Sequence, residues 1–193
     1  MCVLQKHTLF KHFVLHICYM SNTKVKAVID SSFWININKV NLARYLLDYF
    51  ALYSTKKVRE ELLDHPKKDL NIPKDAELFK SLIDAGLISI AVPILIPKDI
   101  RQLLSEDSGE VYVLSLAKER NMSVLLDDNG PLQYCEKNKI RLFTSIHFIY
   151  LLYRDNIISK QDAIDKIMQL KKSINERFAL WGLKLIEDGN NYE

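Results

Sequence analysis

Cysteine is scarce in this chain of 193 residues, and its placement excludes two common roles. Cys2, Cys18 and Cys135 are the only cysteines, and they show no C-x-x-C spacing. The sequence therefore indicates neither a zinc site nor a disulfide framework, and we expect an intracellular, cytoplasmic protein.

Long apolar runs and repeats are also lacking. No stretch approaches the unbroken apolar length of a membrane span, so we expect no membrane partner, and there are no internal repeats or low-complexity tracts. What is present is the composition of a folded domain, with 48% hydrophobic and 26% charged residues. The length suits one domain with a real core. A net charge of +3 permits nucleic acid as a partner without requiring it.

Acidic residues are missing from the beginning of the chain, where the first carboxylate is Asp30. This stretch mixes lysines and apolar residues without the cleavage pattern of a secretory signal. We expect residues 1–23 to be an extension outside the fold, with residues 1–19 either part of it or the product of an upstream start codon. His7, His12 and His16 have helical spacing, but we interpret them as scattered residues of this extension.

Short β-branched strands alternate with helices along the rest of the chain. This order predicts an α/β fold with a central parallel sheet of about five strands, flanked by helices. We expect a domain over 24–158, followed by a helical appendage over 159–193 that packs on it, with Ser159 as its first cap. The predicted strands are 24–30, 50–55, 87–95, 122–128 and 139–145, with one helix over 31–50 and a helix pair over 97–121 broken near Ser108 and Gly109.

Carboxylates follow two of these strands and open two of the helices. Since a parallel sheet brings the carboxyl ends of its strands to one edge, they are expected to converge there. Such a cluster would repel itself without a cation, and hard oxygen ligands favour Mg²⁺ or Mn²⁺. Taken singly, each acid is an ordinary cap or turn residue. The acids are Asp30, Glu60, Glu61, Glu110, Asp127 and Asp128.

Four motifs resemble, in order, those of the PIN-domain nucleases. They are "VIDSSFWIN", "VREEL", "DSGEVYVLSLAKERNMSVLLDDNG" and "IRLFTSIHFIYLLYRDNIIS", and together they span roughly residues 24 to 160. The likeness is to the subgroup with a Gly-Glu step opening a long helix. It implies a three-layer sandwich and a metal-dependent endoribonuclease that uses Mg²⁺ or Mn²⁺ to hydrolyse RNA. It also implies the toxin half of a toxin–antitoxin pair, an antitoxin partner and a homodimer.

The resemblance also assigns the acids. Asp30 matches the first acid of the family, Glu61 the second, Glu110 the third and Asp128 the fourth, with Asp127 as the extra acid of this subgroup. On this assignment Asp30, Glu110 and Asp128, together with Asp127, are metal ligands. Glu61 would complete the ligand shell or orient water.

Two hydroxyl residues and three competing acids accompany this assignment. Ser145 lies where the family has Thr or Ser after the last strand, and Ser32 is the other supporting candidate. The chain has "TS" where the subgroup has Gly-Thr, so the role of Ser145 stays open. Glu106 or Asp107 is an alternative third acid, and Glu60 an alternative second.

Basic and aromatic residues beside these motifs have two interpretations each. Lys137, Lys139 and Arg141 follow the last acids and either contact RNA phosphates near the site or form a solvated surface. Phe33 and Trp34 either stack on bases or, as we favour, belong to the core.

Other functions fit less well. An aspartyl phosphatase would need Asp-x-Asp after the first strand, where this chain has "DSS", and a receiver domain would need its acidic pair early. The alternative that stays open is a non-catalytic PIN-like module that binds RNA or protein.

Overall fold

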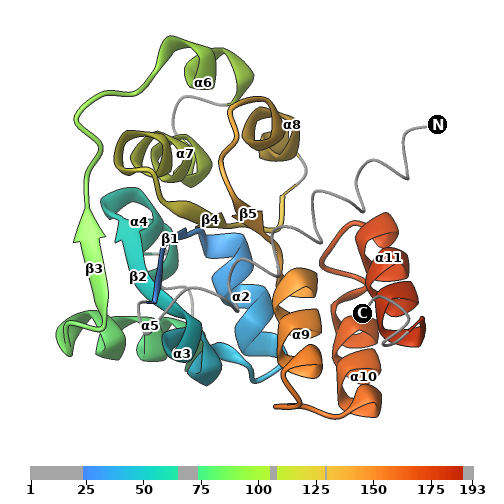
Figure 1. Cartoon of the computed structure of the whole chain (residues 1–193). Helices are drawn as coiled ribbons and strands as arrows, with labels where there is room; N and C mark the ends of the chain where they lie inside the picture. The colour runs from blue at the N-terminus through green and yellow to red at the C-terminus, as the bar shows by residue number, and fades with distance from the viewer. Residues whose placement is uncertain (1–23, 65–73, 105–107, 129, 189–193) are drawn as a thin grey trace.

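The computed structural model of the chain describes residues 24–64, 74–104, 108–128 and 130–188 (Figure 1). Five parallel strands form one sheet in the order β3-β2-β1-β4-β5, which confirms the α/β prediction. All five predicted strands are found. They are β1 (Val25–Ile29), β2 (Phe50–Thr55), β3 (Ile88–Ala91), β4 (Ser123–Leu125) and β5 (Leu142–Phe143).

Helices connect the strands and cover the sheet. In the described part they are α2 (Ser31–Lys39), the 3₁₀ helix η1 (Ala43–Tyr45), α3 (Leu46–Tyr49), α4 (Lys56–Leu63), α5 (Lys74–Asp84), α6 (Lys98–Leu103), α7 (Gly109–Arg120), α8 (Gly130–Lys137), α9 (Ser145–Arg154), α10 (Lys160–Leu170) and α11 (Glu176–Glu187).

The sheet is the middle of three layers. Figure 1 shows α7 and α8 on one side of β4 and β5, with α2 and α9 on the other. In the central strand β1, Ala27, Val28 and Ile29 are fully buried, as expected of a parallel strand covered on both faces. α7 contacts β1, β2 and β4 on one side and α4 and α6 on others, so it is apolar around most of its circumference.

The predicted helix over 31–50 is interrupted in the structure. α2 ends at Lys39, and Asn41 adopts the left-handed conformation with φ 57°. The amide of Leu42 donates to the carbonyl of Ile37 at 3.0 Å, which closes the helix end. η1 and α3 then lead into β2. The apolar periodicity of the sequence continues through the interruption at Asn41, so it does not show where α2 ends.

A helix that was not predicted from the sequence begins within the segment "DDNGP". α8 begins at Gly130, and Pro131 lies in its first turn, where proline needs no amide hydrogen. Its Tyr134 and Cys135 are buried against the core.

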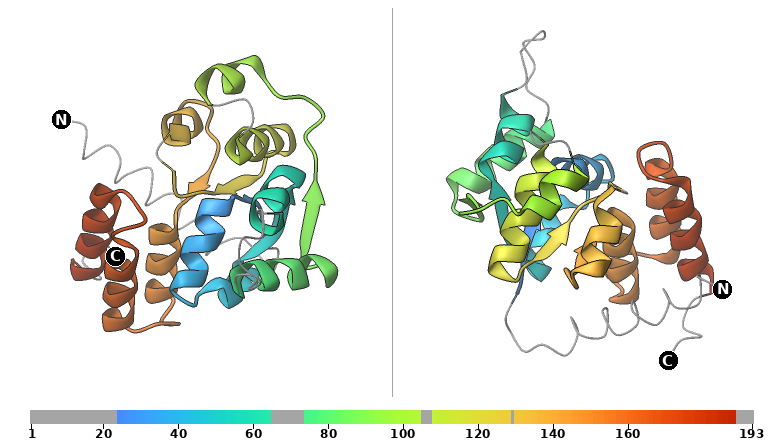
Figure 2. Two further views of the ribbon diagram at one scale, coloured as in Figure 1. Left: turned by 180° about the vertical axis from the view of Figure 1, so that it is seen from behind. Right: turned by 90° about the horizontal axis from the view of Figure 1, so that it is seen from above.

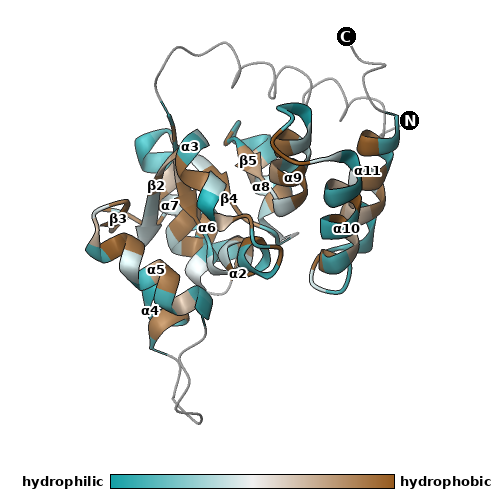
Figure 3. Cartoon of the chain, turned by 90° about the horizontal axis from the view of Figure 1, so that it is seen from below, coloured by the Kyte–Doolittle hydropathy of each residue, from teal (hydrophilic) through white to brown (hydrophobic). Residues whose placement is uncertain are grey.

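The last two helices pack on α9 at one end of the molecule (Figure 2). Ser159 and Asp162 form a capping box at the start of α10. α9, α10 and α11 each carry apolar and polar residues around their circumference, as Figure 3 shows. Gly182 of α11 lies against Ile146 of α9, where a β-carbon would clash, so the two helices approach closely.

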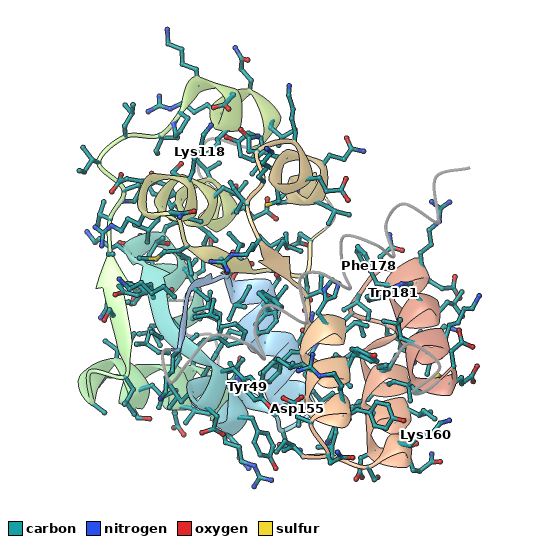
Figure 4. All side chains as sticks on the ribbon, in the orientation of Figure 1. Tyr49, Lys118, Asp155, Lys160, Phe178 and Trp181 are labelled. Atoms are coloured by element: carbon teal, nitrogen blue, oxygen red, sulfur yellow. The ribbon has the colours of Figure 1, made fainter. Side chains whose placement is uncertain are left out.

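A hydrogen bond also links the carboxyl end of α9 to α3. Tyr49 of α3 donates a hydrogen bond to Asp155 at 2.8 Å, directly after α9 (Figure 4). Within the described ranges, no helix combines the length and the apolar character needed to cross a bilayer.

Candidate functional site

Four carboxylates meet at the carboxyl edge of the sheet. Asp30 directly follows β1, and Asp128 lies just beyond β4, the neighbour of β1 in the sheet. Glu61 comes from α4, and Glu110 from the first turn of α7. Burial and, after it, the negative charges of the neighbouring acids raise the pKa values of Asp30 and Glu110, so the four groups lie close enough to interact. The structure therefore brings together four of the six acids that the sequence predicted to converge at one edge; Glu60 and Asp127 have other partners.

Asp30 is a buried carboxylate with one satisfied and one unsatisfied oxygen. It caps α2, and its Oδ2 accepts from the amide of Ser32 at 2.9 Å and from the hydroxyl of Ser32 at 2.7 Å. Its Oδ1 is buried without a hydrogen-bond partner among the described residues. Burial raises the pKa of Asp30 to about 6, against the Ser32 bonds and with help from the charges of Glu61 and Asp128.

Glu61 is held in place by two donors from other elements. Its Oε1 accepts from the amide of Gly109 at 2.8 Å, and its Oε2 accepts from the hydroxyl of Ser31 at 2.9 Å. A β-carbon at position 109 would lie 2.6 Å from Oε2, so only glycine leaves room for this carboxylate. Glu60, the alternative, instead faces Lys56 at 3.7 Å.

Glu110 and Asp128 form a pair at the open side of the rim. Burial, the charges of Asp128 and Asp30, a hydrogen bond with Asp128 and the charge of Glu61 raise the pKa of Glu110 to about 7. With a pKa of about 7, the Glu110 carboxyl is protonated in about half of the molecules at neutral pH.

The adjacent acids Asp127 and Asp128 have different environments, which explains how two like charges follow a buried strand. Asp128 is exposed, whereas Asp127 is buried. Both oxygens of Asp127 are engaged, by the amide and hydroxyl of Ser145 and by Asn36 Nδ2 at 2.7 Å. Burial raises the pKa of Asp127 against these bonds. Its amide donates to the hydroxyl of Ser32 at 3.3 Å, so Ser32 joins the ends of β1 and β4.

Two supporting residues escaped the sequence analysis. Asn36 is buried between two isoleucines on α2, and a polar residue in such an apolar stretch was the available signal. Ser31 follows an acid that already had an assigned role, so nothing marked it as the partner of Glu61.

The three basic residues that were candidates for phosphate contacts lie away from the carboxylate rim. Lys139 and Arg141 precede β5, so they lie at the opposite end of that strand from Ser145, and Lys137 ends α8. Their placement gives no support to phosphate contacts beside the carboxylates. Phe33 and Trp34 are fully buried, which confirms that they belong to the core.

The donor set suits a hard divalent cation. All four groups offer oxygen, Asp30 Oδ1 lacks a partner in the described part, and burial together with neighbouring negative charge raises the pKa values of Asp30 and Glu110. Within the described ranges, no three acidic, histidine or cysteine side chains are arranged so that they could hold a metal ion as they stand. The alternative acids Glu106 and Asp107, and the histidines before residue 20, lie outside the described residues.

A family model described as a PIN domain matches residues 26–179, which include all of the acids discussed above and every strand apart from Val25, the first residue of β1. The match continues through α10 into α11. No curated protein gives a significant match to the chain.

Proposed function

This chain belongs to the PIN-domain family, whose members are generally nucleases, and from that premise we propose that it is a metal-dependent endoribonuclease. The observation that carries the proposal is the rim of four carboxylates at Asp30, whose Oδ1 is buried and has no hydrogen-bond partner among the residues that the structure describes. A buried anionic oxygen without a partner is costly in a folded protein, so it favours a cationic ligand.

We assign Asp30, Glu110 and Asp128 to holding Mg²⁺ or Mn²⁺. Such an ion supplies Lewis-acid polarisation of the phosphodiester and neutralises developing negative charge. Glu110 must lose its proton before it can act as a ligand, so metal binding at this site should strengthen as the pH rises through about 7.

Glu61 is assigned to holding the attacking water. Its two bonds, to Gly109 and Ser31, fix the carboxylate at the start of α7 and leave its remaining lone pairs to accept from a water molecule. Asp127 is a positioning residue on this assignment, because Ser145 and Asn36 occupy both of its oxygens. It joins the end of β4 to α9 and so fixes the direction in which Asp128 leaves the strand.

The choice of RNA as substrate, and of an antitoxin and a second copy of the chain as partners, rests on the likeness of the motifs. We propose RNA as the substrate and an antitoxin and a second copy of the chain as partners.

The test is cleavage of labelled single-stranded and structured RNAs in Mn²⁺, in Mg²⁺ and in EDTA. Wild type should cleave only with metal, and Asp30→Asn should not cleave. Asp165→Asn, which removes an exposed carboxylate on α10, is the matched control and should retain activity. If Asp30→Asn cleaved as wild type does, the carboxylate site would not be the catalyst. If no protein cleaved and calorimetry showed no Mn²⁺ binding, the chain would be a non-catalytic binding module.

A further inference from the structure

A pocket of about 220 Å³ lies beside the acidic rim and takes no part in the site described above. Lys56 directly follows β2 and Val92 directly follows β3, so the pocket opens at the same edge of the sheet as Asp30. Two of its lining residues are close in sequence to acids of the rim. The lining includes Lys56, Lys57, Glu60, Val92, Pro93 and Tyr112.

The pocket combines three kinds of side chain. Tyr112, half-buried on α7, supplies an aromatic ring, and Val92 with Pro93 supplies an apolar wall. Lys56 and Lys57 lie at the start of α4, and the side chain of Lys56 is 70% exposed. The ion pair of Lys56 with Glu60 is long and solvent-exposed, so it holds the lysine only weakly.

The apolar wall continues into an exposed segment that is fixed to the fold. The amide of Ile94 donates to the carboxylate of Glu119 on α7 at 2.6 Å. Ile94 is 91% exposed and Leu95 70% exposed, although both side chains are apolar. The folded chain gains little burial from them, so they form an exposed apolar surface that follows Pro93 along the chain.

The size and chemistry of the pocket favour a nucleobase. Pockets for drug-sized ligands measure roughly 300–1,000 Å³, so this one suits a single flat ring system. Bases stack on aromatic side chains, and lysines contact the phosphates between successive bases. A protein partner would bury the apolar segment, but it would gain little from two lysines beside an aromatic ring.

We propose that this pocket binds one unpaired base of an RNA strand next to the phosphate cleaved at the carboxylate rim, with Tyr112 as the stacking residue and Lys56 and Lys57 as phosphate contacts. The inference rests on the proposed function. It gives the site a preference for single-stranded RNA, since a paired base cannot enter the pocket.

The experiment measures RNA binding rather than cleavage. Fluorescence anisotropy of a short labelled single-stranded RNA is recorded in Mg²⁺ with Asp30→Asn protein, which leaves the RNA intact. Adding Tyr112→Leu should raise the Kd at least about fivefold, the lower end of what loss of one stacked base costs. Tyr112→Phe should bind as the parent does. Tyr45→Leu, on the amino side of β2, is the matched control and should also bind as the parent does.

The lysines are tested in the same assay. Lys56→Gln with Lys57→Gln should weaken binding and reduce its dependence on salt. Lys137→Gln with Lys139→Gln removes the same charge at the end of α8 and just before β5, and should change binding less. Equal effects of the two pairs would mean that only net charge matters, which would overturn the assignment of phosphate contacts.

The outcomes separate this inference from the function on which it rests. If wild type cleaves RNA but Tyr112→Leu binds as tightly as the parent, the base pocket is wrong and the proposed function stands. Equal weakening by Tyr112→Leu and Tyr112→Phe would also refute stacking. If wild type neither cleaves nor binds RNA, the proposed function fails and this inference with it. Thermal melting of each variant shows whether the fold is retained.

Discussion

Replacing Asp30 with asparagine should stabilise the metal-free chain, although the same change abolishes the proposed activity. Burial raises the pKa of Asp30 from 3.8 to about 6. At about 1.4 kcal/mol per pKa unit, ionising this group opposes folding by about 3 kcal/mol at neutral and higher pH. Asparagine carries no charge and still caps α2, so it avoids this penalty.

The sign follows from proton binding. Between about pH 4 and about pH 6 the folded chain holds more protons at Asp30 than the unfolded chain does, so this group lowers the free energy of unfolding as pH rises. About half of the penalty is present at about pH 5 and nearly all at about pH 8. The free energy of unfolding of the variant should therefore rise relative to that of wild type by on the order of 1 kcal/mol between about pH 5 and about pH 8, whatever the asparagine amide costs at the buried Oδ1 position.

Urea unfolding in EDTA at several pH values measures this difference. Asp165→Asn should run parallel to wild type, because it removes an exposed carboxylate. A stability difference between Asp30→Asn and wild type that stayed constant, or shrank, from about pH 5 to about pH 8 would refute the reasoning.

Three further predictions follow from the same contacts. Mn²⁺ at about 100 times its Kd should raise the free energy of unfolding of wild type by about 2.7 kcal/mol and leave Asp30→Asn unchanged, as measured by thermal shift. Gly109→Ala should displace the carboxylate of Glu61, which is the flexible end of a side chain, so RNA cleavage should fall about tenfold or more while the melting temperature by calorimetry stays nearly the same. Ser145→Ala should cost about 1–3 kcal/mol in urea unfolding, because buried Asp127 loses a donor.

Each of these has a control or a contrary result. Gly182→Ala places a β-carbon against Ile146 in the core, so it should destabilise the chain by about 1–3 kcal/mol, unlike Gly109→Ala. Full cleavage activity in Gly109→Ala would mean that the position of Glu61 is unimportant. Equal stabilisation of wild type and Asp30→Asn by Mn²⁺ would place the metal elsewhere, and wild-type stability of Ser145→Ala would mean that Asp127 needs only its remaining donors.

The sheet could be predicted because its signals are local. Each strand is a short apolar run, and the parallel order follows from alternation with helices. Pairing of β1 with β4 then brings Asp30 to the same edge as the acids after β4. The interruption at Asn41 could not be predicted in the same way, because one residue in the left-handed region leaves the apolar periodicity intact.

The roles of neighbouring acids could not be predicted from the sequence. Asp127 and Asp128 are adjacent and chemically identical, but only Asp127 is contacted by Asn36 and Ser145. Both of these partners are distant in sequence from the two acids. The choice of Glu61 over Glu60 likewise depends on Gly109, a residue of another helix. Such contacts are set by tertiary packing, which cannot be read from a single sequence.

The packing of α11 on α9 couples α11 to the sheet, because α9 also contacts β5. α9 offers Ser145 to Asp127 at its first residue and Ile146 to Gly182 at the next, so the two contacts share one turn of helix. Local unfolding of α10 and α11 would release that turn and loosen the end of β4. We therefore expect hydrogen exchange in α11 and at Ser145 to proceed through the same opening event. Proteolytic cleavage in α10 or α11 should then alter the positions of the carboxylates after β4.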